Sequence, residues 1–285
     1  LFTGSRGVGK TTVARLLAKA ANCLMGKNGD PCGKCEVCES IAKGSALDVI
    51  EIDAASHTGV DNVRELIEHA QFRPTSLAMK VFIIDEVHML SKAAFNALLK
   101  TLEEPPSHAM FILATTDIEK VPDTIASRTQ RFDFKRITAE SMGATLSRIA
   151  KDQKLKLADG VIEAVISQSE GSMRDALSRL DMIASLGSGI ALEDVQRLLG
   201  VTPLESVQEL INKIIAHDSA SLPDFFDSTF SGGADPVVFN RSVLHYLRLL
   251  LNAKLTGDET TAKVSAGLQT ELHGQNFTSQ AANLT

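Results

Sequence analysis

Gly4-Ser5-Arg6-Gly7-Val8-Gly9-Lys10-Thr11, followed directly by Thr12, is the stretch that decides the fold. It matches the pattern of phosphate-binding loops, in which a glycine and four further residues precede Gly-Lys-Thr. Glycines let backbone N–H groups close around phosphates, the lysine neutralises the β- and γ-phosphates, and the threonine hydroxyl can ligate Mg²⁺. Leu1-Phe2-Thr3 predicts the end of a buried strand, and the apolar spacing over 13–21 predicts a helix. The stretch therefore predicts a site for ATP and Mg²⁺ between a strand and a helix.

The position of this loop and the composition of the chain limit what kind of protein it is. The loop normally follows a whole strand, yet here it begins at the fourth residue and no Met precedes it. We therefore expect a fragment that lacks an N-terminal segment, and also a C-terminal extension because Gln275–Thr285 forms no closing element. The 285 residues are 44% hydrophobic, enough for two or three domains. No apolar run is long enough to cross a bilayer, which predicts a cytoplasmic protein without a membrane partner.

The charge of the chain restricts how it would contact nucleic acid. Its net charge of −6 provides no broad basic surface, so any DNA contact would come from a local patch. Trp is absent and Tyr occurs once, which argues against base-stacking platforms as the main device.

The four cysteines lie close together within about residues 22–40: Cys23, Cys32, Cys35 and Cys38. Two overlapping C-x₂-C steps favour a tetrahedral thiolate site for Zn²⁺. A disulfide interpretation needs an oxidising compartment, which an ATP-binding loop argues against, and a redox C-x-x-C pair accounts for only half of the cysteines. Four thiolates leave no position open for a substrate, so the predicted zinc is structural. The module is predicted to be an insertion in a nucleotide-binding core.

A second nucleotide motif ends the predicted strand Lys80–Glu86. The four apolar residues over 81–84 indicate burial on both faces, as in a parallel sheet, and the acidic pair follows at the carboxyl end, where such sheets place ligands. Asp85 is predicted to hold Mg²⁺, directly or through water. Glu86 is predicted to polarise the water that attacks the γ-phosphate. The alternative is an acidic pair that merely ends a strand.

Another predicted buried strand, Met110–Thr115, brings polar residues to the same edge. The Thr116 hydroxyl is predicted to hydrogen-bond the γ-phosphate or the attacking water, whereas the alternative is that Thr116 and Asp117 only turn the chain. Strands alternate with helices over residues 1–136. This alternation predicts an α/β fold with a doubly wound parallel sheet.

From residue 137 the pattern predicts helices only. They are expected near 139–153, 159–169, 172–186 and 192–199, and after a linker at Val201-Thr202-Pro203 near 206–216, 222–230 and 235–255. The last group shows no catalytic constellation and is predicted to serve packing.

One arginine in this helical part is placed unusually. Ser172 is predicted to cap a helix, which puts Arg174 in the first turn, where the helix dipole disfavours a cation. An anion that the arginine must reach, such as a phosphate, explains this position. The alternative is a salt bridge to Asp175 or Asp181.

Taken in order, these motifs resemble one protein family. The segments that carry the resemblance are the phosphate loop, the cysteine insertion, Glu51–Ser56, Ile84–Leu90, Asn96–Pro106, Ala114–Thr116 and Ser127-Arg128. They resemble the gamma/tau subunits of bacterial DNA polymerase III, the AAA+ ATPases of the sliding-clamp loader, clearly to about residue 200 and more weakly beyond. The resemblance implies an AAA+ nucleotide-binding domain over 1–136, a helical lid over 137–200 and a collar-like helical oligomerisation domain over 201–285.

The resemblance also implies roles for single residues. Lys10 and Glu86 would act in catalysis, Thr116 would lie in the first sensor region, and Arg174 would be the second sensor that reports on the γ-phosphate. Arg128 lies in a Ser-Arg-Cys signature in which this chain has Thr129 instead of cysteine. It would act in trans as an arginine finger on a neighbouring subunit's ATP, and the alternative is an interface salt bridge. Two basic residues are implied DNA contacts, or else solvated surface charges: Arg64 and Lys100.

The implied function is to couple ATP binding and hydrolysis to loading of the sliding clamp on primed DNA during replication. The implied partners are the other subunits of a hetero-pentamer, the clamp and primer–template DNA. A non-hydrolysing clamp-loader subunit would lack an intact phosphate loop, and an archaeal or eukaryotic small subunit is not expected to carry the cysteine insertion. A DExH-type helicase is suggested by Asp85-Glu86-Val87-His88, but the chain lacks a second motor-sized α/β domain. Another AAA+ DNA-remodelling ATPase is the remaining alternative.

Overall fold

The computed structural model describes residues 1–256 except 186, 188–190, 200–203 and 232–234. The chain divides into two compact units, one formed by residues 1–155 and 165–185 and the other by 156–164 and the residues from 186 onward. The predicted domain boundaries near 136 and 200 stay predictions. The predicted linker at Val201-Thr202-Pro203 and all positions after Thr256 lie outside the described residues.

The first unit is built on a five-stranded parallel sheet with the strand order β2-β3-β4-β1-β5. The strands are β1 (Phe2–Thr3), β2 (Val49–Asp53), β3 (Lys80–Asp85), β4 (Ala109–Thr115) and β5 (Phe132–Asp133). The predicted parallel α/β sheet is confirmed. In this order, β4 lies between β1, which precedes the phosphate loop, and β3, which ends in Asp85. The end of β4 is therefore next to both nucleotide motifs.

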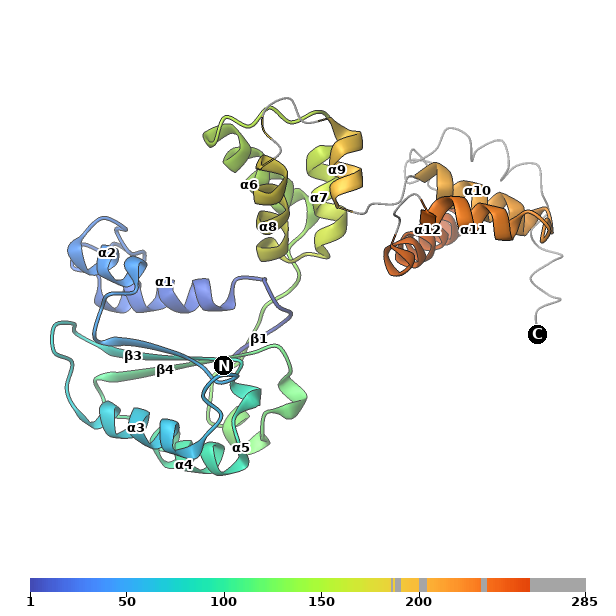
Figure 1. The fold of residues 1–285 in the computed structure, drawn as a ribbon. Coiled ribbons are helices and arrows are strands. Elements are labelled where there is room, and N and C mark those ends of the chain that lie inside the picture. Colours follow the sequence, from blue (N-terminus) through green and yellow to red (C-terminus); the bar gives the residue numbers. More distant parts are fainter. Residues whose placement is uncertain (186, 188–190, 200–203, 232–234, 257–285) are drawn as a thin grey trace. The chain divides into compact units, whose positions relative to one another are not determined.

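Helices cover both faces of this sheet (Figure 1). One layer contains α1 (Lys10–Asn22) and α2 (Glu36–Lys43), and the other contains α3 (Val60–Gln71), α4 (Lys92–Glu103) and α5 (Asp123–Ala126). Side chains of β3 alternate between the layers, as the pleat of a strand requires. Val81 and Ile83 join the core beneath α1, while Phe82 and Ile84 pack beneath α3 and α4. All four are fully buried, which explains the continuous apolar run.

Short 3₁₀ turns follow β3 and β4 at their carboxyl ends. The turn η1 (Val87–Met89) comes directly after the acidic pair, and η2 (Ile118–Lys120) follows Asp117. These turns keep the polar residues that end β3 and β4 next to the sheet instead of leading the chain away.

The helical part follows the predicted pattern. The first unit contains α6 (Ala139–Asp152) and α8 (Met173–Ala184), and α7 (Val161–Ser169) has residues in both units. The second unit contains α9 (Leu192–Leu198), α10 (Leu204–Ile215), α11 (Leu222–Ser231) and α12 (Pro236–Thr256). Leu210, Phe225 and Phe239 form a small core between α10, α11 and α12. Among the described residues, no helix combines the length and the apolar character needed to cross a membrane.

Candidate nucleotide-binding site

The phosphate loop connects β1 to α1 as predicted. Gly4, Gly7 and Gly9 all have positive φ angles of 144°, 77° and 100°, which side-chain-bearing residues rarely adopt. Lys10 begins α1 and is 5% exposed, and its ammonium donates hydrogen bonds to the carbonyl oxygens of Gly4 at 2.8 Å and Ser5 at 3.0 Å. Burial lowers the pKa of Lys10, whereas the nearby Glu86 and Asp85 carboxylates oppose that shift. The backbone of the loop thus holds the buried ammonium of Lys10.

Two oxygen ligands suited to a hard cation meet beside the loop. The Thr11 hydroxyl in α1 donates a hydrogen bond of 2.7 Å to Asp85 Oδ2 at the end of β3. Asp85 Oδ1 accepts a second hydrogen bond from the backbone N–H of Glu86 at 2.9 Å. Hydroxyl and carboxylate oxygens in this number fit Mg²⁺, which keeps most of its water and takes few protein ligands. The two predicted Mg²⁺ ligands therefore lie together.

Glu86 lies between the acidic strand and the end of β4. Its backbone is in the left-handed region with φ of 46°, a conformation uncommon for a residue with a side chain. Glu86 Oε2 accepts hydrogen bonds from the Thr116 hydroxyl at 2.7 Å and from the Thr116 N–H at 3.2 Å. The contact depends on the strand order, since β4 neighbours β3. The predicted base and the predicted first sensor residue are thus direct partners.

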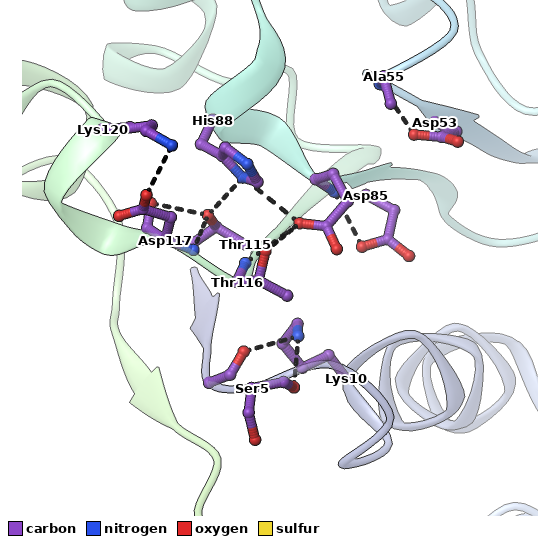
Figure 2. A network of polar contacts seen from close by, with 12 residues as sticks. Ser5, Lys10, Asp53, Ala55, Asp85, His88, Thr115, Thr116, Asp117 and Lys120 are labelled. Atoms are coloured by element: carbon purple, nitrogen blue, oxygen red, sulfur yellow. Dashed lines mark hydrogen bonds and ion pairs between the residues drawn. The ribbon is translucent and has the colours of Figure 1, made fainter. Parts of the chain in front are cut away.

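The polar network extends to four further residues, none of which was predicted as a site residue from the sequence (Figure 2). His88 Nδ1 lies 3.3 Å from Glu86 Oε2 and 3.0 Å from the hydroxyl of the fully buried Thr115. Thr115 in turn hydrogen-bonds the backbone of Asp117, whose carboxylate is ion-paired with Lys120 at 2.9 Å. That lysine lowers the pKa of Asp117. In the sequence, His88 belongs to the segment Ile84–Leu90 and to the motif Asp85-Glu86-Val87-His88, but neither pattern gave it a role of its own.

The start of α8 contacts the phosphate loop directly. The backbone N–H of Met173 donates to the Gly7 carbonyl at 3.0 Å, and a side chain on Gly7 would overlap the Ser172 hydroxyl. Ser172 caps α8 as predicted, by accepting a hydrogen bond from the Asp175 N–H. Arg174 is exposed in the first turn of α8, and its guanidinium has no hydrogen bond or ion pair with the described residues. The alternative salt bridges to Asp175 and Asp181 are not formed.

Arg128 makes its contacts elsewhere in the first unit. Its Nε donates to Glu103 at 2.6 Å, and its Nη1 donates to the carbonyl oxygen of Thr124 at 2.7 Å. Arg64 is exposed and ion-paired with Asp61 at 3.1 Å, and Lys100 is exposed on α4. In the described part of the chain, none of these three cations contacts the cluster around Lys10.

The four cysteine sulfurs converge as predicted for a metal site. All four Sγ atoms lie within 4.8 Å of one another, and no disulfide joins them. A tetrahedral zinc site with Zn–S bonds of about 2.3 Å has sulfurs about 3.8 Å apart, close to this arrangement. The backbone N–H of Cys38 lowers the pKa of Cys35 to about 6, and the N–H of Cys32 donates to Cys23 Sγ at 3.2 Å. Backbone donors that stabilise thiolates suit zinc ligation.

Two family models match the chain. One, described as "DNA polymerase III, delta subunit", matches residues 1–138, and the other, described as "DNA polymerase III subunits gamma and tau domain III", matches residues 190–283. DNA polymerase III subunit tau of Bacillus subtilis is 43% identical over 252 residues, which is 88% of this chain and 45% of that protein. Subunit tau of Escherichia coli is 44% identical over 216 residues, which is 75% of this chain and 34% of that protein.

The chain belongs to the DNA polymerase III gamma/tau family. The resemblance inferred from the motifs is thereby confirmed. The gamma/tau chain described here spans about half the length, or less, of these two relatives.

The fold has also been seen in solved structures. The RuvB Holliday junction branch migration motor of Thermotoga maritima aligns with a TM-score of 0.50 and 16% identity, over 86% of this chain and 78% of that one. At this identity the likeness concerns the fold alone. It shows that the parallel sheet with its phosphate loop, followed by further helices, is a fold found in another protein.

Proposed function

We propose that the chain is the ATPase subunit of a bacterial sliding-clamp loader, which couples ATP binding and hydrolysis to loading of the clamp on primed DNA. The observation that carries this proposal is the convergence of Lys10, the Thr11–Asp85 pair and the Glu86–Thr116 pair at one edge of a parallel sheet. Lys10 would neutralise phosphate charge, the Thr11–Asp85 pair would hold Mg²⁺, and the Glu86–Thr116 pair would position the attacking water. The gamma/tau family of the chain supplies the replicative context.

The residues of the site divide the chemistry between them. Lys10 would release its two loop carbonyls and turn its ammonium to the β- and γ-phosphates. Thr11 and Asp85 would hold Mg²⁺, which when bound neutralises charge on the phosphate oxygens. Glu86 would accept the proton of the attacking water, and Thr116 would orient Glu86 or the γ-phosphate. Arg174, exposed at the start of the helix that contacts Gly7, would reach the γ-phosphate from the lid.

Arg128 is proposed to act on the ATP of a neighbouring subunit. In this chain its guanidinium is held by Glu103 and by the carbonyl of Thr124. An arginine finger must reach the phosphate of another subunit, so the Glu103 pair would be exchanged for phosphate when subunits of the proposed hetero-pentamer meet.

The remaining proposals concern metal and DNA. The four cysteines would hold a structural Zn²⁺, because their donor set is closed and lies away from the phosphate loop in sequence. Arg64 and Lys100 would contact the DNA backbone as local basic positions on an acidic protein. The cytoplasm is the proposed compartment, as for an ATP-dependent replication protein.

Steady-state ATP hydrolysis by the full-length protein in its assembled complex tests this function. The proposal expects stimulation by clamp and primed DNA, and loss of that stimulation in Glu86→Gln and Arg128→Ala while ATP binding is retained. A hydrolysis rate that is unchanged both by the clamp and by Arg128→Ala would contradict clamp loading and the proposed role of Arg128 on a neighbouring subunit's ATP. Unwinding of a labelled duplex would instead favour the DExH helicase, and movement of branched DNA would favour another AAA+ remodelling enzyme.

A further inference from the structure

One oxygen of Glu86 receives all the hydrogen bonds that this carboxylate makes in the described structure. Oε2 accepts hydrogen bonds from the Thr116 hydroxyl at 2.7 Å and the Thr116 N–H at 3.2 Å, and His88 Nδ1 lies 3.3 Å from the same oxygen, within ion-pair distance. Figure 2 shows the His88 ring beside the ends of β3 and β4, with dashed lines to Thr115 and to the carboxylate. Glu86 Oε1 has no hydrogen bond to the described residues, so one oxygen is held and the other is open to a ligand or water.

The neighbouring hydroxyl determines which nitrogen of His88 carries a proton. Thr115 Oγ1 has a single hydrogen, and it donates that hydrogen to the Asp117 carbonyl at 3.0 Å. The same oxygen accepts from the Asp117 N–H at 3.0 Å. Its contact with His88 Nδ1 must therefore be with a donor, and the carboxylate of Glu86 can also only accept. Both partners require that Nδ1 carries the proton.

We propose that His88 is a positioning residue that holds Glu86 for the hydrolysis of ATP. This inference rests on the proposed role of Glu86 as the base. The Nδ1–H of His88 orients Oε2, which leaves Oε1 directed to accept the proton of the attacking water. Thr115 keeps the ring in place because its own hydroxyl is fully committed to Asp117 and His88.

His88 and Thr116 differ in how free they are to leave Glu86. Thr116 is only half-buried at the open edge, and its hydroxyl can turn to the γ-phosphate. The side chain of His88 is 10% exposed and is wedged between Glu86 and the buried Thr115. His88 is thus the constant partner of the base, and Thr116 is the partner that exchanges when nucleotide binds. Around the ring, the charged groups on the neighbouring elements are Glu86, Asp117 and Lys120.

A second histidine of the same unit provides a matched control. His108 is also half-buried, but its Nε2 contacts the carbonyl oxygen of Ala70 in α3, at the other end of the sheet from Glu86. Its loss would affect packing around α3 without touching the base. A histidine with a purely structural role would behave like His108.

The experiment compares two side chains that place an amide at different positions of the imidazole. Asn at position 88 puts its NH₂ near the site of Nδ1, whereas Gln puts it near the site of Nε2. In the assembled complex with clamp and primed DNA, His88→Gln and His88→Ala should lower kcat about tenfold or more, with ATP affinity changed by less than about threefold. His88→Asn should recover most of the lost kcat, and His108→Ala should change thermal stability without lowering kcat.

Each outcome decides the question. Recovery by Asn but not Gln supports a donor at the Nδ1 position. Equal losses in all three His88 variants, or kcat that is unchanged or raised in His88→Gln, would overturn it. Glu86→Gln in the same assay separates the two proposals. If Glu86→Gln abolishes hydrolysis while His88→Gln does not lower kcat, only the inference about His88 fails, and if Glu86→Gln retains full hydrolysis, the proposed role of the base fails first.

Discussion

Buried charged residues lie at both ends of the sheet, but their surroundings differ between the two ends. At the amino ends of the strands, Asp48 and Lys80 are 1% and 6% exposed, and both are surrounded by backbone groups of the chain. At the carboxyl ends, Lys10 is equally buried at 5%, but it faces Asp85 and Glu86 across the open edge of the sheet. Burial alone therefore does not distinguish a structural charge from a functional one.

The amino end pairs its charges with backbone groups of the chain. The Asp48 carboxylate accepts hydrogen bonds from the backbone N–H groups of Thr75, Ser76 and Leu77 at 2.7–2.9 Å and from the Ser76 hydroxyl at 3.1 Å. The Lys80 ammonium donates to the carbonyl oxygens of His69 and Phe72 at the end of α3. A cation at a helix C-terminus also interacts favourably with the helix dipole. These charges hold the loop before β3 and the end of α3 in place.

The carboxyl end leaves its charges with unused capacity. Lys10, like Lys80, donates to two carbonyl oxygens, but it also lies beside the Asp85 and Glu86 carboxylates. Among the described residues, Glu86 Oε1 accepts no hydrogen bond and the Arg174 guanidinium makes no ion pair. Buried and cleft charges that are incompletely paired cost stability unless a ligand completes them. The comparison teaches that a buried charge held by the backbone alone stabilises the fold, whereas a buried charge beside other charged groups with spare hydrogen-bonding capacity marks a place for a ligand.

The largest effect is expected from an Asp→Asn substitution at the carboxyl end of the sheet, and it should be an effect on activity. Asp85→Asn keeps the shape of the side chain but removes half of the proposed Mg²⁺ ligand pair. We expect ATP hydrolysis to fall by about a hundredfold or more, because metal-assisted charge neutralisation is lost. The unfolding free energy should stay within about 1 kcal/mol of the wild type, since repulsion with Glu86 is relieved. Hydrolysis at the wild-type rate would contradict the assignment of Asp85 as a functional residue.

The cysteine cluster is a second set of groups that protein contacts alone do not satisfy, because the four thiols converge without forming a disulfide. We expect the purified protein to contain about one zinc per chain, and Cys35→Ser to lose it with a loss of stability of about 3 kcal/mol or more. Elemental analysis and thermal unfolding with and without a chelator measure both quantities. Ser40→Ala, in the same helix α2 but outside the cluster, is the control. Full stability without metal would show that the thiols need no ligand.

The smallest expected effect comes from Asp48→Asn at the structural end, where stability changes and activity per folded molecule does not. An Asn amide would direct its NH₂ at backbone N–H donors, at a cost of about 2 kcal/mol at neutral pH. Burial by itself would raise the pKa of Asp48, but the N–H groups of Ser76, Thr75 and Leu77 outweigh it and hold that pKa below its usual range.

The sign of the pH dependence follows from that lowered pKa. The carboxylate of Asp48 contributes its full stability above about pH 4–5, near the pKa of an unfolded Asp, and the contribution is lost as pH falls through the lower folded pKa. The difference in unfolding free energy between the wild type and Asp48→Asn should thus be constant near neutral pH and shrink in acid. Denaturant titrations at several pH values measure it, and a difference that grows in acid would contradict the assignment.

Local patterns made much of this predictable. The phosphate loop, the cysteine spacing and the acidic strand end are each contiguous in sequence, and the parallel sheet follows from alternating strands and helices. The contacts that were missed join distant segments. The Asp48 partners lie more than two dozen residues away, and His88 reaches Thr115 only because β4 is inserted beside β3. No spacing rule in a single sequence reports such partners.

The most direct test of the account compares its two buried lysines. Thermal unfolding of the wild type, Lys10→Met and Lys80→Met would be measured with and without Mg²⁺ and ATP. The account predicts that Lys80→Met unfolds at a lower temperature but is stabilised by nucleotide as much as the wild type, whereas Lys10→Met unfolds near the wild-type temperature and gains little from nucleotide. A full nucleotide-dependent gain in Lys10→Met, or its loss in Lys80→Met, would contradict the division of the sheet into a structural and a functional end.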